Sequence, residues 1–304
     1  MSLGARYAAL AALALCGAAL VVLLYQARIR TPLESTLTTS FQILGVPLKL
    51  GDRLASRVLP VNELDERELG EVYRAKYDGQ IKSGDRAQAY LDGVVAELWP
   101  LTRKPFRYRA YVVGYSEPNA MALPGGVILV TRALLQTLHS ESELVAVLAH
   151  EMGHIERGHC FDAVRFQLLA RKLGVQPLGS LADLATQLLL RHSYSKTMEH
   201  EADDYAFTLL VDTLYDPRGE GAAFRSMQAW LAQRGRATPQ HASPLRDYFA
   251  SHPPLEIRAE EYGERANAWW RAHADERRYV GVENLRVLQA LAGFEMTAEW
   301  TIGP

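Results

Sequence analysis

The stretch AHEMGH at residues 149–154 constrains the fold more than any other part of the chain, because its lead-in is apolar and helix-forming. Ser140 and Glu143 stand three positions apart just before the apolar residues of that lead-in. This spacing is typical of a capping box, which marks the start of a helix. We therefore predict a buried helix that begins after Ser140 and carries residues 149–154.

Two histidines on such a helix can bind one metal ion. His150 and His154 are four residues apart, and side chains at this spacing share a helix face. Two imidazoles in this arrangement hold zinc at about 2.0–2.1 Å. Glu151 projects about 100° around the helix, where its carboxylate reaches a water on the ion but not a ligand position. The pattern predicts a zinc site with Glu151 as general base, and Gly153 leaves room beside it.

Zinc needs a third protein ligand if one position is to stay open for water. His159 is close in sequence, but it follows His154 by five residues, whereas the metzincin pattern HExxHxxGxxH requires six. Arg157 also stands where that pattern has glycine. The metzincin interpretation is therefore excluded by register, and we expect His159 to continue the same helix.

A second helix is predicted over residues 193–210, SYSKTMEHEADDYAFTLL. Glu199 and Asp203 lie one turn apart on one face of it, while Glu201 points roughly opposite. We predict that Glu199 is the third ligand of a single zinc ion. Asp203 is then the carboxylate that accepts a hydrogen bond from a ligand histidine and orients it.

An uncharged apolar run over residues 7–25 is followed by two arginines. Because a run of this length spans a bilayer, we expect a transmembrane anchor within residues 1–30. Two alternatives stay open, a cleaved signal peptide and a lipoprotein signal ending at Cys16. After this segment the predicted parts are a linker at 31–50, the folded metal-binding domain at 51–265 and a C-terminal extension at 266–304.

The rest of the pattern favours a mainly α fold of the α+β class, with a small β-sheet beside two metal-bearing helices. Helices are predicted at 61–78 and 85–99, and a strand at 106–113. A β-branched run begins the segment 125–135 and gives way to a helix. The apolar segment 166–190 is consistent with a helical hairpin. A net charge of −2 provides no basic surplus for phosphates, so nucleic acid is not an expected partner.

Four motifs in order give the chain a resemblance to a known family. They are NAMALPGGVILVTRALL (119–135), AHEMGH (149–154), YSKTMEHEADDYA (194–206) and SHPPLEIR (251–258). Together they resemble the gluzincin zinc metalloendopeptidases, the family that includes the CAAX prenyl protease, HtpX and BepA. The resemblance covers about residues 60–265 and implies a zincin-like metalloprotease domain. A single predicted spanning segment distinguishes the chain from the multi-spanning members.

The resemblance implies the same zinc ligands and the same catalytic Glu151, and it adds two further sets of residues. His252 and Arg258 are expected at the catalytic centre. His252 would either occupy the open zinc position and block water or stabilise the transition-state oxygen, and Arg258 would place the substrate or anchor the loop. A cleft edge that binds an extended peptide is expected at Asn119, Ala120, Met121, Ala122, Gly125 and Gly126.

The expected function is zinc-dependent hydrolysis of peptide bonds in misfolded or misassembled envelope proteins. Family analogy places the chain in a bacterial inner membrane with the catalytic domain in the periplasm. The alternative is a membrane-tethered, chaperone-like module that binds zinc without cleaving. The intact Glu151 favours the enzyme, because a non-catalytic module has no need of a base there.

Overall fold

The computed structural model describes residues 61–303, except 173–177, 192–193 and 235–254. The predicted anchor at 7–25, the linker and His252 lie outside these residues. Within the described ranges, no helix combines the length and apolar character needed to cross a membrane.

The described fold is mainly helical with two small sheets, which confirms the predicted α+β class. The helices are α4 (Glu63–Asp78), α5 (Arg86–Leu98), α6 (Arg132–Thr137), α7 (Glu141–Glu156), α8 (His159–Lys172), α9 (Leu178–Arg191), α10 (Lys196–Val211), α11 (Gly219–Arg234), α13 (Leu255–Ala272) and α14 (Val282–Val287). The strands are β1 (Arg109–Val113), β2 (Ala120–Leu123), β3 (Val127–Thr131), β4 (Arg277–Tyr279) and β5 (Trp300–Ile302).

The helix starts follow from local capping. Asn62 caps α4, and its side chain and that of Asp65 form a reciprocal capping box. Asp85 caps α5 by accepting from two backbone N–H groups of the first turn. Ser140 caps α7 by accepting from the backbone of Glu143, as the sequence predicts. The predicted hairpin at 166–190 consists of parts of α8 and α9, which pack against each other.

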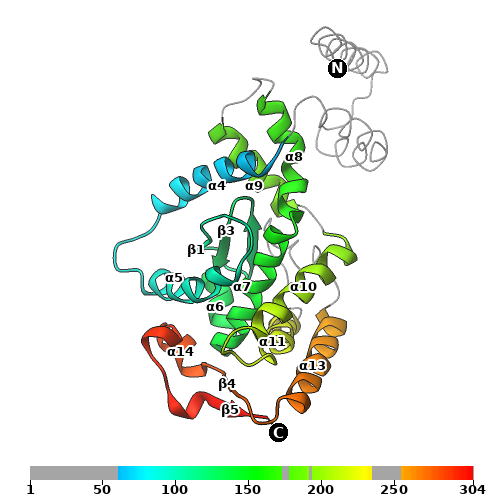
Figure 1. The fold of residues 1–304 in the computed structure, drawn as a ribbon. Coiled ribbons are helices and arrows are strands. Elements are labelled where there is room, and N and C mark those ends of the chain that lie inside the picture. Colours follow the sequence, from blue (N-terminus) through cyan, green and yellow to red (C-terminus); the bar gives the residue numbers. More distant parts are fainter. Residues whose placement is uncertain (1–60, 173–177, 192–193, 235–254, 304) are drawn as a thin grey trace. The chain divides into compact units, whose positions relative to one another are not determined.

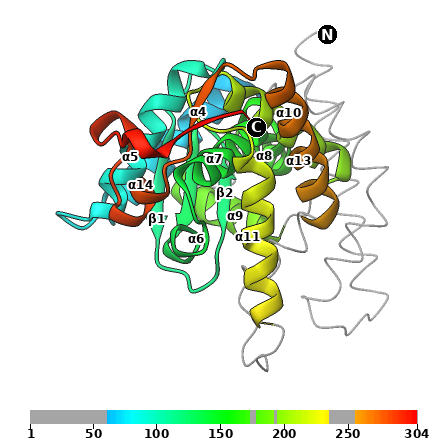
Figure 2. The same cartoon turned by 90° about the horizontal axis from the view of Figure 1, so that it is seen from below.

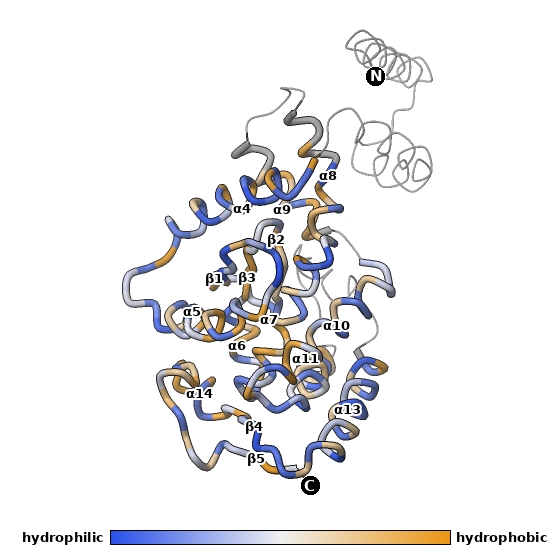
Figure 3. The backbone as a smooth tube through the Cα atoms, viewed as in Figure 1, coloured by the Kyte–Doolittle hydropathy of each residue, from blue (hydrophilic) through white to orange (hydrophobic). Residues whose placement is uncertain are grey.

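The main sheet has the order β1–β3–β2, with β1 parallel and β2 antiparallel to β3. Figure 1 shows α4 and α9 above this sheet and α6 below it, while α7 runs beside it. In Figure 3 the central strand β3 is apolar, whereas polar and apolar residues are mixed along α13. Every residue of β3 is buried, so this strand forms the centre of the sheet's core.

The turn between β2 and β3 contains Gly125 and Gly126, at φ of 82° and 88°. A Cβ at Gly125 would lie 2.6 Å from the Cα of Gly70 on α4, and the Gly125 carbonyl accepts a hydrogen bond from Arg74. Both requirements, a left-handed backbone and a close approach, select glycine. Gly125 is therefore buried against α4, whereas a Cβ at Gly126 would meet Phe106 and Arg107. The predicted place of the two glycines on the peptide-binding edge stays a prediction.

The C-terminal segment is part of the same compact unit, which runs from Asn62 to Pro304. The predicted boundary at residue 265 falls inside α13. The first N–H groups of α7, at Glu141 and Ser142, donate to the carbonyls of Gly281 and Val280. These groups have no partner within the helix, so the C-terminal segment completes the start of the metal-bearing helix.

The Glu141 carboxylate strengthens this connection from a fully buried position. Its Oε1 accepts from the Tyr215 hydroxyl at 2.7 Å and from the Leu291 backbone at 3.0 Å. Burial raises the pKa of Glu141 to about 7, although these hydrogen bonds lower it. The folded protein therefore holds a proton on Glu141 under conditions in which the unfolded chain has lost it.

This pKa difference predicts a pH-dependent effect of Glu141→Gln. The contribution of Glu141 to stability is fully present below about pH 4.5 and is lost as the pH rises towards 7, by about 1.4 kcal/mol per pKa unit. Glutamine has no proton to lose. The free energy of unfolding of Glu141→Gln, relative to wild type, should therefore rise by about 2–3 kcal/mol between pH 5 and pH 8. Denaturant unfolding of the full chain measures this difference.

The matched control is Glu260→Gln, because Glu260 is exposed on α13. A relative stability of Glu141→Gln that stays flat with pH would contradict the raised pKa.

Candidate metal centre

The candidate metal site lies where α7 and α10 approach closely. A Cβ at Gly153 would lie 2.9 Å from the Ala202 carbonyl oxygen and 3.1 Å from its Cα. Gly153 therefore lets the backbone of α10 come close to the histidine-bearing turn of α7, as its position in the sequence indicated. The same approach brings Glu199, in the first turn of α10, to the two histidines.

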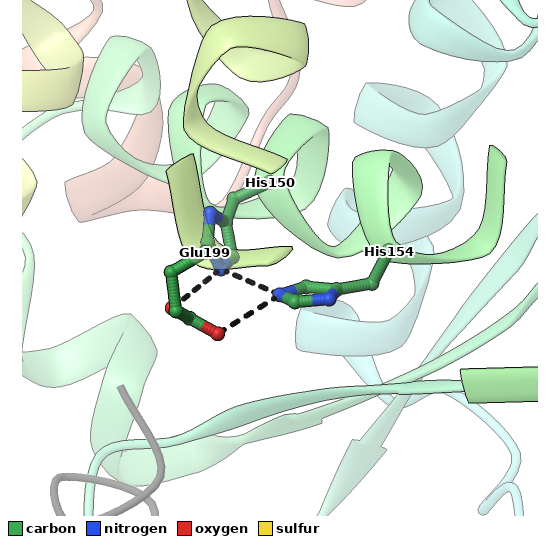
Figure 4. A group of neighbouring side chains, drawn as sticks. All are labelled: His150, His154 and Glu199. Atoms are coloured by element: carbon green, nitrogen blue, oxygen red, sulfur yellow. Dashed lines mark hydrogen bonds and ion pairs between the residues drawn. The ribbon is translucent and has the colours of Figure 1, made fainter. Parts of the chain in front are cut away.

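Three buried side chains converge at this contact, His150, His154 and Glu199 (Figure 4). The Nε2 atoms of His150 and His154 lie 3.1 Å apart. Glu199 Oε1 lies 3.4 Å from His154 Nε2, and its Oε2 lies 3.8 Å from His150 Nε2. Donors at about 2.0–2.1 Å around a tetrahedral zinc ion are about 3.3–3.4 Å apart. The 3.1 and 3.4 Å separations are close to this value and the 3.8 Å separation is longer. The donor set of two imidazoles and one carboxylate fits one zinc ion.

Asp203 and Arg258 contact two of these three side chains, His150 and Glu199. His150 Nδ1 lies 2.8 Å from Asp203 Oδ1. Arg258 donates to both oxygens of Asp203, at 2.7 and 2.5 Å, and its Nη1 lies 3.3 Å from Glu199 Oε2. Burial alone would raise the pKa of Asp203, but the Arg258 charge and the hydrogen bond with His150 hold it below its usual value. An ionised Asp203 can then accept a hydrogen bond from the Nδ1–H group of His150.

Glu151 lies beside the ligands and faces strand β2. Its Oε2 accepts the backbone N–H of Ala122 at 2.7 Å. This contact orients the buried carboxylate and connects the HExxH helix to the strand where a peptide is predicted to bind. The arrangement could support metal-assisted hydrolysis, because three side chains could hold an ion and the Glu151 carboxylate lies beside them, next to a strand.

Comparison with known proteins decides the family. The family model for peptidase family M48 matches residues 85–266, more than half of the chain, including α7, α10 and the start of α13. The chain belongs to peptidase family M48.

Relatives of this M48 chain carry protease names. Mitochondrial metalloendopeptidase OMA1 of Arabidopsis thaliana is 31% identical over 148 residues, 47% of this chain and 28% of the relative. Metalloprotease LoiP of Escherichia coli (strain K12) is 26% identical over 179 residues, 54% and 64% of the two chains. Beta-barrel assembly-enhancing protease of Yersinia pestis is 29% identical over 181 residues, 54% and 35%. The matched region thus covers between 28% and 64% of these relatives.

The M48 domain places His159 differently from the sequence prediction. Helix α7 ends at Glu156, and Gly158 takes a left-handed φ of 77° before α8 begins at His159. A glycine in this conformation commonly ends a helix. His159 is therefore not a continuation of α7. The break turns its ring back towards the site, where its Nδ1 lies 3.0 Å from His154 Nδ1.

Glu201 is exposed, as predicted for an outward carboxylate, but it also has a partner that was not predicted. It lies off the face that carries Glu199, as predicted, but its Oε2 lies 3.0 Å from His159 Nε2. Tyr194 stacks on the His154 ring, with centroids 4.1 Å apart. Sequence reasoning missed the contacts of His159 and Tyr194 with His154, and that of Glu201 with His159. The glycine at 158, one position after the place that metzincins require, was the available signal.

Arg258 and Asn119 to Ala122, which are also predicted site residues, lie near the three metal-facing side chains or near Glu151. The buried Arg258 contacts Asp203 and Glu199. Its predicted catalytic role stays a prediction. Asn119 directly precedes strand β2, and Ala120, Met121 and Ala122 lie on that strand, next to Glu151. His252 cannot be compared, because it lies outside the described residues.

Proposed function

We propose that this chain is a zinc-dependent endopeptidase in which Glu151 is the general base. The observation that carries the proposal is the convergence of His150, His154 and Glu199 beside the Glu151 carboxylate. Membership of peptidase family M48 supports it. The three side chains would hold one zinc ion, in the combination of two histidines and a glutamate that catalytic zinc sites use.

The side chains of this site define the proton path. When bound, zinc supplies the Lewis acidity that acidifies water and polarises a peptide carbonyl. Glu151 takes the proton of the attacking water and passes it to the leaving amine. The N–H of Ala122 holds one oxygen of Glu151 in place for both transfers. Asp203 and Arg258 act indirectly, by keeping His150 and Glu199 in position.

Strand β2 is the sheet edge that a substrate would extend. On the opposite edge, the Gln88 side chain accepts from the Val112 N–H and donates to the Ala110 carbonyl, so β1 is already occupied. On β2 the Ala122 N–H points away from β3, towards Glu151. Backbone groups alternate in direction along a strand, so Ala120 faces the same side.

An extended peptide would add to this β2 edge through main-chain hydrogen bonds to groups other than the Ala122 N–H, which donates to Glu151. Such bonds give little sequence preference. Asn119, Ala120, Met121 and Ala122 are then the substrate-binding residues. We therefore expect the enzyme to cleave unfolded chains, since only these present an extended backbone to the edge.

The location of the chain is proposed from its N-terminal sequence, and its natural substrates are proposed by analogy with its relatives. The apolar run at 7–25 supports a membrane anchor. Relatives include Escherichia coli metalloprotease LoiP and the Yersinia pestis beta-barrel assembly-enhancing protease. We place the chain in a bacterial inner membrane with its catalytic domain in the periplasm, where it would degrade misfolded or misassembled envelope proteins.

The proposed activity predicts a specific pattern of cleavage. The purified full chain should cleave unfolded casein, lose that activity with a chelator and regain it when zinc is added back. A compact, stable domain should resist cleavage and become a substrate once it is unfolded. Gel electrophoresis and mass spectrometry of the fragments measure both effects. Zinc binding without any cleavage would favour the chaperone-like module instead.

A further inference from the structure

The two ligand histidines differ in what contacts the nitrogen that faces away from the metal position. His150 Nδ1 meets the carboxylate of Asp203 at 2.8 Å. His154 Nδ1 instead meets another imidazole, at 3.0 Å from His159 Nδ1. Outer partners that accept from a ligand histidine fix its orientation and tautomer. The His159 contact therefore lies at the position where a carboxylate or carbonyl usually stands.

The positions of the hydrogens in this chain of contacts follow from the geometry. A neutral histidine that presents Nε2 to a metal carries its hydrogen on Nδ1. His154 Nδ1 then donates, and His159 Nδ1 must accept, because two N–H groups cannot face each other at 3.0 Å. The His159 hydrogen is consequently on Nε2, which lies 3.0 Å from Glu201 Oε2 and donates to it. Glu201 thus selects the tautomer of His159 that His154 requires.

From this geometry we infer that Glu201 and His159 form a positioning relay for the zinc ligand His154. His159 is a positioning residue that accepts from His154, and Glu201 keeps His159 in the accepting tautomer. The inference rests on the proposed metal centre. It extends that centre to α8, which supplies His159, and gives α10 a second function besides supplying Glu199 and Asp203.

Burial sets the order of the expected effects. The His159 side chain is 5% exposed, whereas that of Glu201 is 47% exposed. Solvent screens the contact with Glu201 and can replace part of it, so removal of Glu201 should cost less than removal of His159. Tyr194 stacks on His154 and limits movement of the ring, but a stacking contact does not select a tautomer.

The test is the zinc affinity of the full chain, measured by competition with a chelator of known affinity. His159→Phe keeps an aromatic ring but removes the acceptor, and it should weaken zinc binding by about 10- to 100-fold. His159→Gln retains both an acceptor for His154 and a donor for Glu201. It should restore affinity to within about 5-fold of wild type, since hydrogen bonding and not ring shape is required. Glu201→Ala should lie between these two variants.

A double mutant distinguishes the relay from independent packing effects. If Glu201 acts through His159, Glu201→Ala should cause no further loss of affinity in a His159→Phe background. Glu256→Ala is the control for loss of a carboxylate, because Glu256 is exposed in the first turn of α13. The melting temperature of the metal-free protein shows whether any variant is simply misfolded.

Several outcomes would overturn the relay. They are wild-type affinity in His159→Phe, a loss in His159→Gln as large as in His159→Phe, or additive losses in the double mutant. If the wild-type chain does not bind zinc at all, the metal centre itself is wrong and the relay fails with it. If wild type binds zinc and His159→Phe binds it equally well, only the relay is wrong.

Discussion

Glu151→Gln should lower kcat/KM for unfolded substrates by about 10²- to 10⁴-fold, the range that general acid–base groups contribute. The amide cannot take the proton of the attacking water, and no other side chain is placed as a substitute base in the described site. Glutamine keeps the shape of the side chain, and its carbonyl oxygen can still accept the N–H of Ala122. The loss should therefore appear in turnover and not in the fold.

The measurement is steady-state cleavage of unfolded casein by the zinc-loaded variant, with zinc content determined on the same sample. Zinc content should equal that of wild type, because Glu151 is not among the three metal-facing side chains. Turnover near the wild-type rate would remove Glu151 from its role as base. A low rate combined with a loss of zinc would show that the residue holds the metal site together.

The sequence was sufficient for the central part of the site because its signals are local. The Ser140 cap and the apolar lead-in define the start of α7, and the spacing of His150 and His154 places both on one face. The spacing of Glu199 and Asp203 does the same on α10, where the structure brings both to the histidines. Each of these predictions depends on the spacing of residues within one helical turn. Packing of α7 against α10 does not change that spacing.

The contacts that sequence reasoning missed all join segments that are distant in the sequence or separated by a chain reversal. Gly158 reverses the chain after α7, and this reversal, not helix periodicity, brings His159 to His154. A helical wheel correctly placed Glu201 away from Glu199, but it could not show that α8 supplies a partner there. Likewise, no local pattern connects Gly281 to the first turn of α7.

The glycines at 125 and 126 show which structural requirements a motif does not reveal by itself. The motif from Asn119 to Gly126 includes an edge strand and the turn that follows it. The positive φ of both glycines, and the contact with Gly70 on α4, belong to the turn. The close approach of Gly125 to Gly70, on a helix more than 50 residues earlier in the chain, is a packing requirement that the motif does not show.

The second large effect should follow from removal of the third ligand. Glu199→Ala should weaken zinc binding by more than the 10- to 100-fold that is typical for loss of an outer partner, because it takes away one of three protein donors. Asp203→Ala should fall within about that 10- to 100-fold range, through the orientation of His150. Glu201→Ala should cause the smallest loss of the three. Chelator competition on the full chain measures all three variants.

The stability of the metal-free protein should also distinguish Glu199→Ala from Asp203→Ala. Asp203→Ala leaves the buried Arg258 without its bidentate partner, and loss of one member of a buried ion pair costs about 3–5 kcal/mol. Glu199→Ala leaves that pair intact, since Arg258 retains Asp203. The metal-free Glu199→Ala protein should therefore melt close to wild type, while metal-free Asp203→Ala should melt well below it. If Glu201→Ala empties the site while Glu199→Ala stays loaded, α10 presents a different face to the metal than the one described here.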